Sequence, residues 1–111
     1  MTFANLRGLG LALAIAAAIS LRFGVVSAQA QEVQITIDNF TFSPAEMKVK
    51  VGDTVTWTNH DDIPHTVVSA GKFRSKTMDT DDKYSFTFTS AGDYKYFCSL
   101  HPHMTGMIKV E

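Results

Sequence analysis

Apolar side chains alternate with polar ones along most of the chain, and this period of two residues limits the fold more than any other feature. The alternating runs are short, and turn-forming pairs such as Ser43-Pro44 and Gly52-Asp53 separate them. Alternate residues of a strand face opposite sides of a sheet, so the pattern predicts half-buried β-strands. The runs lie at 33–37, 40–42, 47–51, 55–57, 84–88, 94–98 and 107–110.

Seven or eight short strands in a chain of 111 residues indicate a single all-β domain, either an antiparallel sandwich or a small barrel. The runs 47–51 and 55–57 are expected to form a hairpin around Gly52-Asp53. A short strand is expected at 65–69. The segment 70–83 is polar and aperiodic, and its mixed charges favour a solvent-exposed face.

The first thirty residues differ in composition from the rest of the chain. Arg7 precedes an apolar run from Gly8 to Leu21, and the small residues Ala28 and Ala30 follow it. This order is typical of a secretory signal peptide, and the run is short for a membrane span. We therefore predict a signal peptide at 1–30, cleaved after Ala30 or Ala28, and a domain at 31–111 that is exported to the periplasm and not inserted in the membrane. An uncleaved N-terminal anchor is the alternative.

Charge and cysteine content restrict the class of protein further. Residues 31–111 contain eleven acidic and eight basic side chains, a net charge of −3, which removes the electrostatic basis for binding nucleic acid. Cys98 is the only cysteine, so no internal disulfide can form. Small domains without disulfides often gain stability from a bound metal. We expect the protein to be a monomer. Because no disulfide can form, we also expect a bound metal as a source of stability.

Residue types that bind soft metals gather near the C-terminus. Cys98, His101 and Met104 lie close together in the sequence, and His65 follows Pro64 at the start of a predicted strand. A thiolate, two imidazoles and a weak axial thioether are the ligands of a blue copper site. Zinc accepts the same thiolate and imidazoles, but thioether is a poor zinc ligand. The sequence favours one copper ion that cycles between Cu(II) and Cu(I).

The remaining methionines and histidines of the domain, and its tryptophan, are expected to have structural roles or to be exposed. Met107 competes with Met104 for the axial position, but it follows Gly106 in a predicted strand, so we expect it in the core. His60 and His103 are expected to be solvent-exposed rather than ligands. Met78 is expected in a surface patch, and Met47 and Trp57 in the core.

The chain resembles the cupredoxins, and most closely their amicyanin-like branch, with the plastocyanins as further relatives. The stretches that carry the resemblance are VTWTN at 55–59, Pro64-His65, FTFTSAGDYKYFC at 86–98 and HPHM at 101–104. The two residues between His101 and Met104 are similar to the amicyanin loop. The resemblance implies a cupredoxin-like Greek-key β-sandwich. It also implies His65, Cys98, His101 and Met104 as copper ligands, with Met104 axial.

Two positions depart from that family pattern. Thr66 follows the first ligand histidine, where asparagine is common and braces the ligand loops. We expect the Thr66 hydroxyl to form hydrogen bonds in its place. Leu100 stands where proline is frequent. Neither change alters the expected ligands, but the first bears on the reduction potential.

A four-ligand site leaves no open position for a substrate, so we expect one-electron transfer and no enzyme activity. A multicopper enzyme would need further histidine clusters, and the chain has four histidines in total. The alternative is a periplasmic copper carrier without a redox role. That function requires exposed, exchangeable ligands, whereas His65 and Cys98 lie among apolar strand residues.

An apolar patch near the predicted site is expected to receive redox partners. Its residues are Ile63, Pro64, Leu100 and Pro102. Transient redox complexes form over small surfaces of this kind. Amicyanins, which the chain resembles, accept electrons from methylamine dehydrogenase and pass them to c-type cytochromes. We do not carry these particular partners over, and expect only a partner of this kind, a c-type cytochrome or a dehydrogenase. The sequence itself identifies neither.

Overall fold

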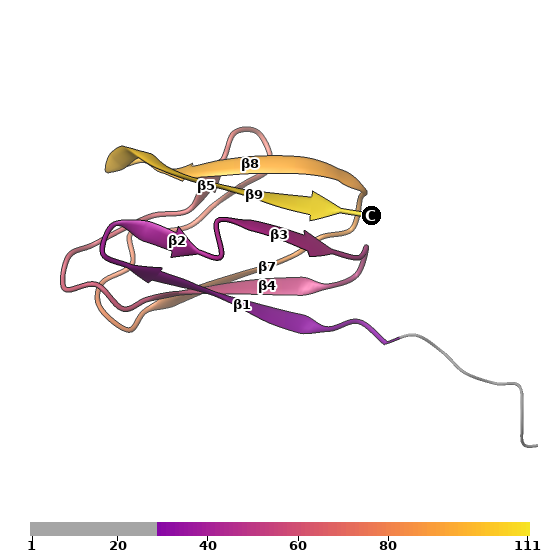
Figure 1. The fold of residues 1–111 in the computed structure, drawn as a ribbon, viewed down its shortest axis with the longest axis horizontal. Helices are drawn as coiled ribbons and strands as arrows, with labels where there is room; N and C mark the ends of the chain where they lie inside the picture. Colours follow the sequence, from indigo (N-terminus) through magenta and orange to yellow (C-terminus); the bar gives the residue numbers. More distant parts are fainter. Residues whose placement is uncertain (1–28) are drawn as a thin grey trace, which may run out of the picture.

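The computed structural model describes residues 29–111, so the predicted signal peptide at 1–30 lies almost entirely outside the described residues. Two sheets pack face to face (Figure 1). One has four strands in the order β2-β1-β4-β7, and the other has five in the order β3-β9-β8-β5-β6. The strands are β1 (Glu32–Asp38), β2 (Thr41–Ser43), β3 (Glu46–Val49), β4 (Thr54–Asn59), β5 (Val68–Ser69), β6 (Phe73–Arg74), β7 (Lys83–Thr87), β8 (Gly92–Cys98) and β9 (His101–Val110).

The predicted all-β sandwich is confirmed, with one strand more than expected. The expected strand at 65–69 is represented by β5, and β6 forms within the aperiodic segment 70–83, for which an irregular strand or a helical turn was expected. The part of the chain that the structure describes contains no helix long and apolar enough to cross a membrane.

The core lies between the two sheets and follows the alternation of the sequence. Ile35 and Ile37 of β1 are buried, while the neighbouring positions of that strand are at least partly exposed. Trp57 is fully buried, as expected, and its ring lies 5.4 Å from the ring of Tyr96 on the opposite sheet. Burial of alternate residues from both sheets is the main source of stability in such a sandwich.

The predicted hairpin around Gly52-Asp53 is wrong. Strand β3 pairs in parallel with β9, whereas β4 pairs in parallel with β1 and antiparallel with β7. The turn therefore carries the chain from one sheet to the other. Gly52 has a φ of 100°, and the Asp53 carboxylate accepts hydrogen bonds from the backbone N–H groups of Gln31 and Lys50. Alternation indicates that a segment is a strand but not which sheet it joins.

Four connections meet at the end of the sandwich away from Gly52, as Figure 1 shows for the turns after β1 and β8. They are the β1–β2 turn, the loop from β4 to β5, the loop from β6 to β7 and the β8–β9 hairpin. In that hairpin Cys98 pairs with His101, and Phe97 pairs with Thr105. Residues 102–104 therefore form a bulge on β9, which changes the direction of the side chains that follow His101.

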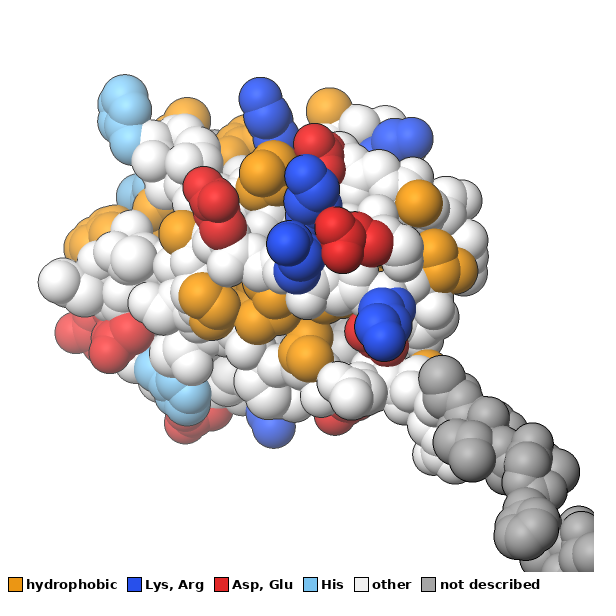
Figure 2. Space-filling model, turned by 45° about the vertical axis from the view of Figure 1, so that its right-hand side comes forward, with side chains coloured by type: hydrophobic (Ala, Val, Ile, Leu, Met, Phe, Trp, Pro, Cys, Tyr) orange, Lys and Arg blue, Asp and Glu red, His pale blue; other side chains and the backbone are white. Residues whose placement is uncertain are grey.

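Charged side chains are mixed over the face shown in Figure 2, where Lys and Arg alternate with Asp and Glu. Lys48 and Lys109 lie on neighbouring strands with Glu46 beside them. This face accordingly presents no single-sign field to a charged partner.

Candidate metal centre

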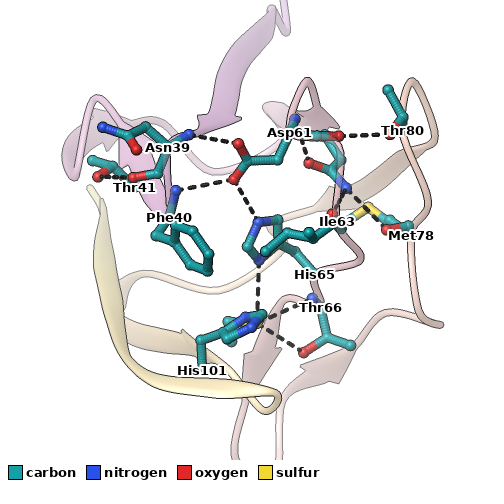
Figure 3. Close-up of polar contacts among 12 residues, drawn as sticks. Asn39, Phe40, Thr41, Asp61, Ile63, His65, Thr66, Met78, Thr80 and His101 are labelled. Carbon is teal, nitrogen blue, oxygen red and sulfur yellow. Dashed lines mark hydrogen bonds and ion pairs between the residues drawn. The ribbon is translucent and has the colours of Figure 1, made fainter.

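Three of the four predicted ligands come together at this end of the sandwich. One side-chain donor atom from each of His65, Cys98 and His101 lies within 4.8 Å of the others. The Cys98 Sγ is 3.8 Å from His65 Nδ1 and 3.5 Å from His101 Nδ1. His65 and Cys98 are fully buried, whereas His101 is half-buried. Figure 3 shows that the two imidazoles approach each other from different loops.

The fourth predicted ligand, Met104, lies in the core cluster and is 6% exposed. Met104 is the last residue of the bulge at 102–104 and is buried, whereas the two residues before it, Pro102 and His103, are exposed. The same hairpin therefore supplies Cys98, His101 and Met104. A ligand group on a hairpin end between two packed sheets is held by the rigid sandwich, which suits a preorganised site.

Hydrogen bonds fix the backbone and the ring of His65. Its N–H donates to the Met78 carbonyl oxygen at 3.1 Å, and its carbonyl accepts from the Met78 N–H at 2.9 Å. Its Nε2 lies 2.7 Å from Asp61 Oδ2. A carboxylate only accepts, so Nε2 carries the proton and the lone pair of Nδ1 is directed towards Cys98. Asp61 thus selects the tautomer that can bind a metal through Nδ1.

Asp61 was missed by sequence reasoning. Its place between His60 and Asp62 indicated a solvated loop, and His60 and Asp62 are indeed exposed, whereas Asp61 is buried. Burial raises the pKa of its carboxyl, but hydrogen bonds from the Phe40 N–H and from His65 outweigh burial and leave the pKa below its usual value. The carboxylate is therefore charged next to His65.

Thr66 forms the hydrogen bonds that we expected of it. Its backbone N–H donates to Cys98 Sγ at 3.4 Å, and its hydroxyl oxygen accepts from the Ser99 N–H at 2.7 Å. The hydroxyl also lies 2.8 Å from Ser99 Oγ and 3.8 Å from Cys98 Sγ. Thr66 therefore connects the strand after His65 with the hairpin that holds Cys98.

The surroundings of Cys98 favour its thiolate. Burial alone raises the pKa of the thiol, but the N–H of Thr66, the two imidazoles and the N–H of Leu100 outweigh burial and lower the pKa to about 6. The thiolate is the form of cysteine that binds metals. The site is thus prepared for a cation at near-neutral pH.

Two expectations about methionines are wrong. Met78 is 3% exposed and belongs to the core, because its backbone pairs with that of His65 beneath the surface loops. Met107 is half-buried and lines an open groove of about 620 Å³ beside Pro102 and Tyr96. Ile108 and Val110 are the buried residues at this end of β9, so the regular alternation places Met107 on the opposite face of the strand. Met47 is half-buried against the core, and His60 and His103 are exposed, as expected.

The predicted apolar patch lies around His101, with one residue that was not foreseen. Leu100 is 48% exposed, Pro64 and Pro102 are exposed and Ile63 is half-buried. Phe40 is 49% exposed, and its ring centre lies 5.6 Å from that of His65 and 5.1 Å from that of His101, both nearly perpendicular. The alternation assigned Phe40 to a strand, whereas it lies in the β1–β2 turn.

The donor chemistry of these residues fits a copper ion. A thiolate, two imidazole nitrogens and a thioether are the donor types of a copper site that exchanges electrons. The Asp61 carboxylate contacts Nε2 of His65 and not the donor atoms that face one another. It therefore orients the His65 ring and is not itself a candidate metal ligand.

Comparisons with known proteins agree with this geometry. Residues 9–110 match the model of a cupredoxin-like domain. The chain is 38% identical over 88 residues to amicyanin from Paracoccus versutus, covering 74% of this chain and 67% of that protein. It is 38% identical over 85 residues to amicyanin from Paracoccus denitrificans, covering 71% of this chain and 65% of that protein. The chain therefore spans about two thirds of the length of these two relatives. A chloroplastic plastocyanin from Tetradesmus obliquus is 35% identical over 91 residues, covering 68% of this chain and 62% of that protein.

Solved structures give the same result. A purple cupredoxin from Nitrosopumilus maritimus aligns with a TM-score of 0.69 at 35% identity, covering 71% of this chain and 99% of that one. The Cu(I) form of an amicyanin variant aligns with a TM-score of 0.69 at 36% identity, covering 78% of this chain and 86% of that one. The sandwich, the His-Cys-His group and these matches together show that the chain belongs to the cupredoxin family, with amicyanins and plastocyanins among its relatives.

Proposed function

We propose that this protein binds one copper ion through His65, Cys98, His101 and Met104 and carries single electrons between protein partners in the periplasm. The observation that carries the proposal is the gathering of the first three side chains within 4.8 Å of one another, two of them fully buried. Met104, from the same hairpin, would complete the set and supply the weak thioether ligand. Bound copper supplies a one-electron couple between Cu(II) and Cu(I).

The residues around the ligands support rapid electron transfer. Asp61 holds the ring of His65, and Thr66 links Cys98 to the neighbouring strand, so the ligands keep one arrangement in both oxidation states. His101 is the half-buried one of the three gathered ligands, its ring contacts Phe40, and two other residues of the apolar patch, Leu100 and Pro102, are its neighbours in the sequence. We infer that electrons enter and leave through the exposed side of His101.

Burial separates this function from copper transport without a redox role. A copper carrier must release its ion to an acceptor, and this requires ligands that an incoming donor can reach. His65 and Cys98 are both 0% exposed. Exchange of the ion therefore requires opening of the sandwich end, whereas electron transfer requires only contact at His101.

The remaining parts of the proposal concern location and partners. Removal of a signal peptide at 1–30 would leave residues 31–111 as an exported carrier, which fits the apolar run that precedes Ala28 and Ala30. The apolar patch fits a transient complex with a c-type cytochrome or a dehydrogenase. Mass spectrometry of the protein secreted by a bacterial host tests the cleavage site, since an intact N-terminus would contradict export by this route.

Repeated redox cycling tests the function directly. In each cycle the copper-loaded protein is reduced by a stoichiometric amount of ascorbate and reoxidised by a ferric c-type cytochrome, with a copper(I) chelator present. An electron carrier transfers one electron per copper in each cycle and keeps its metal. Loss of copper to the chelator within one cycle, without electron transfer, would support the copper carrier instead.

A further inference from the structure

Phe40, in the turn between β1 and β2, has a backbone conformation that phenylalanine rarely adopts. Asp38 pairs with Thr41, so the turn consists of Asn39 and Phe40 alone, with φ values of 51° and 56°. Two consecutive left-handed residues are typical of the type I′ turn, whose preferred sequence is Asn-Gly. Asn39 suits its position, but a bulky side chain such as that of Phe40 is rarely found in this region.

Burial does not account for the choice of phenylalanine. Phe40 leaves 49% of its surface exposed, more than any other described phenylalanine. What the ring does contact is the metal centre, because it lies nearly perpendicular to the imidazoles of both His65 and His101, at 87° and 88°. A glycine in this turn would leave both imidazoles uncovered on that side.

Asp61 connects this turn to the ligands. Its Oδ1 accepts from the Asn39 N–H at 2.8 Å, and its Oδ2 accepts from the Phe40 N–H at 3.0 Å. The same Oδ2 accepts from His65 Nε2 at 2.7 Å (Figure 3). Asp61 is itself held, because Asn59 Oδ1 accepts its N–H and its carbonyl accepts from the Thr80 hydroxyl. One carboxylate thus fixes both the turn and the ring that the turn covers.

We propose that Phe40 is a positioning residue that holds the imidazoles of His65 and His101 in place for the metal, and that the chain retains a strained turn for this purpose. The inference rests on the proposed metal site. Strained residues persist where the surrounding structure holds them and the strain has a use. Here Asp61 holds the backbone of Phe40, and the use is the contact of its ring with two ligands on different loops.

The strain is tested on the metal-free protein with the variants Phe40→Ala and Phe40→Gly. Both remove the ring, and only glycine relieves the backbone. We expect Phe40→Gly to unfold at a higher temperature than Phe40→Ala, which reverses the usual order of these residues outside left-handed positions. A lower melting temperature for Phe40→Gly would overturn the claim of strain.

The positioning role is tested by transfer of copper(I) from the loaded protein to a chelator. Edge-to-face aromatic contacts have modest energies, so we expect transfer to be about threefold to tenfold faster in Phe40→Gly and Phe40→Ala than in wild type. Phe40→Tyr, which keeps the ring, should restore the wild-type rate. Asp81→Gly is the matched control, because Asp81 is also left-handed, with a φ of 71°, and its side chain is exposed beside His60. Equal rates in all five proteins would overturn the proposal.

A second readout separates this proposal from the proposed function. Nitrogen-15 relaxation of the imidazoles in the metal-free protein should show a more mobile His101 ring in Phe40→Gly than in wild type or Phe40→Tyr. If the wild-type protein bound no copper, the proposed function would fail while this measurement still decided the role of Phe40. Unchanged ring mobility in Phe40→Gly would refute that role whatever the metal result.

Discussion

The hydroxyl oxygen of Thr66 accepts the backbone N–H of Ser99 at 2.7 Å and thereby joins the strand after His65 to the hairpin that carries Cys98. Thr66 is 5% exposed, and the hydroxyl approaches Cys98 Sγ at 3.8 Å. The resemblance to cupredoxins led us to expect this bracing from an asparagine, and here the shorter Thr66 side chain makes the connection.

Replacement of Thr66 by valine, which has nearly the same shape, should destabilise the metal-free protein. The Ser99 N–H loses its acceptor within the protein, and loss of one such hydrogen bond costs about 0.5–1.5 kcal/mol. The reduction potential should also fall, because a donor near the thiolate sulfur favours the reduced metal. Chemical denaturation and voltammetry measure the two effects. Thr66→Ser is the control, and a Thr66→Val protein equal to it in both measurements would contradict the assigned role.

The two methionines of β9 should have separable effects. Met104→Leu removes the thioether that stabilises the oxidised metal, so the reduction potential should rise. Met107 lines the groove at the surface of the sheet, so Met107→Leu should leave the potential unchanged and alter stability by less than about 1.5 kcal/mol. Voltammetry of both variants checks the assignment. The same shift in both proteins would show that the axial ligand is wrongly placed.

Docking should depend on Leu100, which is 48% exposed next to His101. A charged side chain at the centre of a small apolar interface opposes desolvation, so Leu100→Asp should slow electron transfer to a c-type cytochrome by at least about tenfold. Stopped-flow kinetics measure the second-order rate, with spectrum and potential checked separately. Val51→Asp is the matched control, because Val51 is 49% exposed in the turn after β3, beside the C-terminal residue Glu111. Equal slowing by both substitutions would exclude Leu100 as the docking surface.

Asp53 should make the stability of the fold depend on pH. Hydrogen bonds from the N–H groups of Gln31 and Lys50 hold the pKa of Asp53 below its usual value of 3.8, although burial acts in the opposite direction. A folded-state pKa below the unfolded one stabilises the fold above the unfolded value, and this stabilisation is lost as pH falls through the folded value. The melting temperature of metal-free Asp53→Asn should thus be lower than that of wild type at about pH 7, and the gap should close below about pH 4.

The control for this prediction is Asp93→Asn, which alters an exposed carboxylate at the start of β8. Its melting temperature should follow that of wild type at every pH. A constant gap between Asp53→Asn and wild type down to about pH 3 would mean that the amide disrupts packing and that charge has no part.

Features that depend on neighbours in the sequence were predictable from it. The alternation predicted most of the strands, and three of the predicted ligands, Cys98, His101 and Met104, lie close together in the sequence and on one hairpin. His65 was assigned from its position after Pro64 and the resemblance to cupredoxins. All four predicted ligands lie within residues 29–111, which the structure describes.

Features that depend on contacts between distant turns were not predictable. Phe40 reaches the imidazoles because the β1–β2 turn lies beside the β4–β5 loop, and Asp61 is buried because two backbone N–H groups of that turn point at it. Neither contact changes the local pattern of apolar and polar residues, so the sequence gives no sign of them. The sheet to which β3 belongs was missed for the same reason, since pairing partners are chosen by the whole fold.

The central claim is that Cys98 binds copper through its thiolate together with two histidines. The most direct test is the visible absorption spectrum of residues 31–111 titrated with copper(II), compared with that of Cys98→Ser. We predict an intense thiolate-to-copper charge-transfer band that saturates at one copper per chain and is absent from the variant. A colourless complex of the wild-type protein, or the same band in Cys98→Ser, would contradict the account.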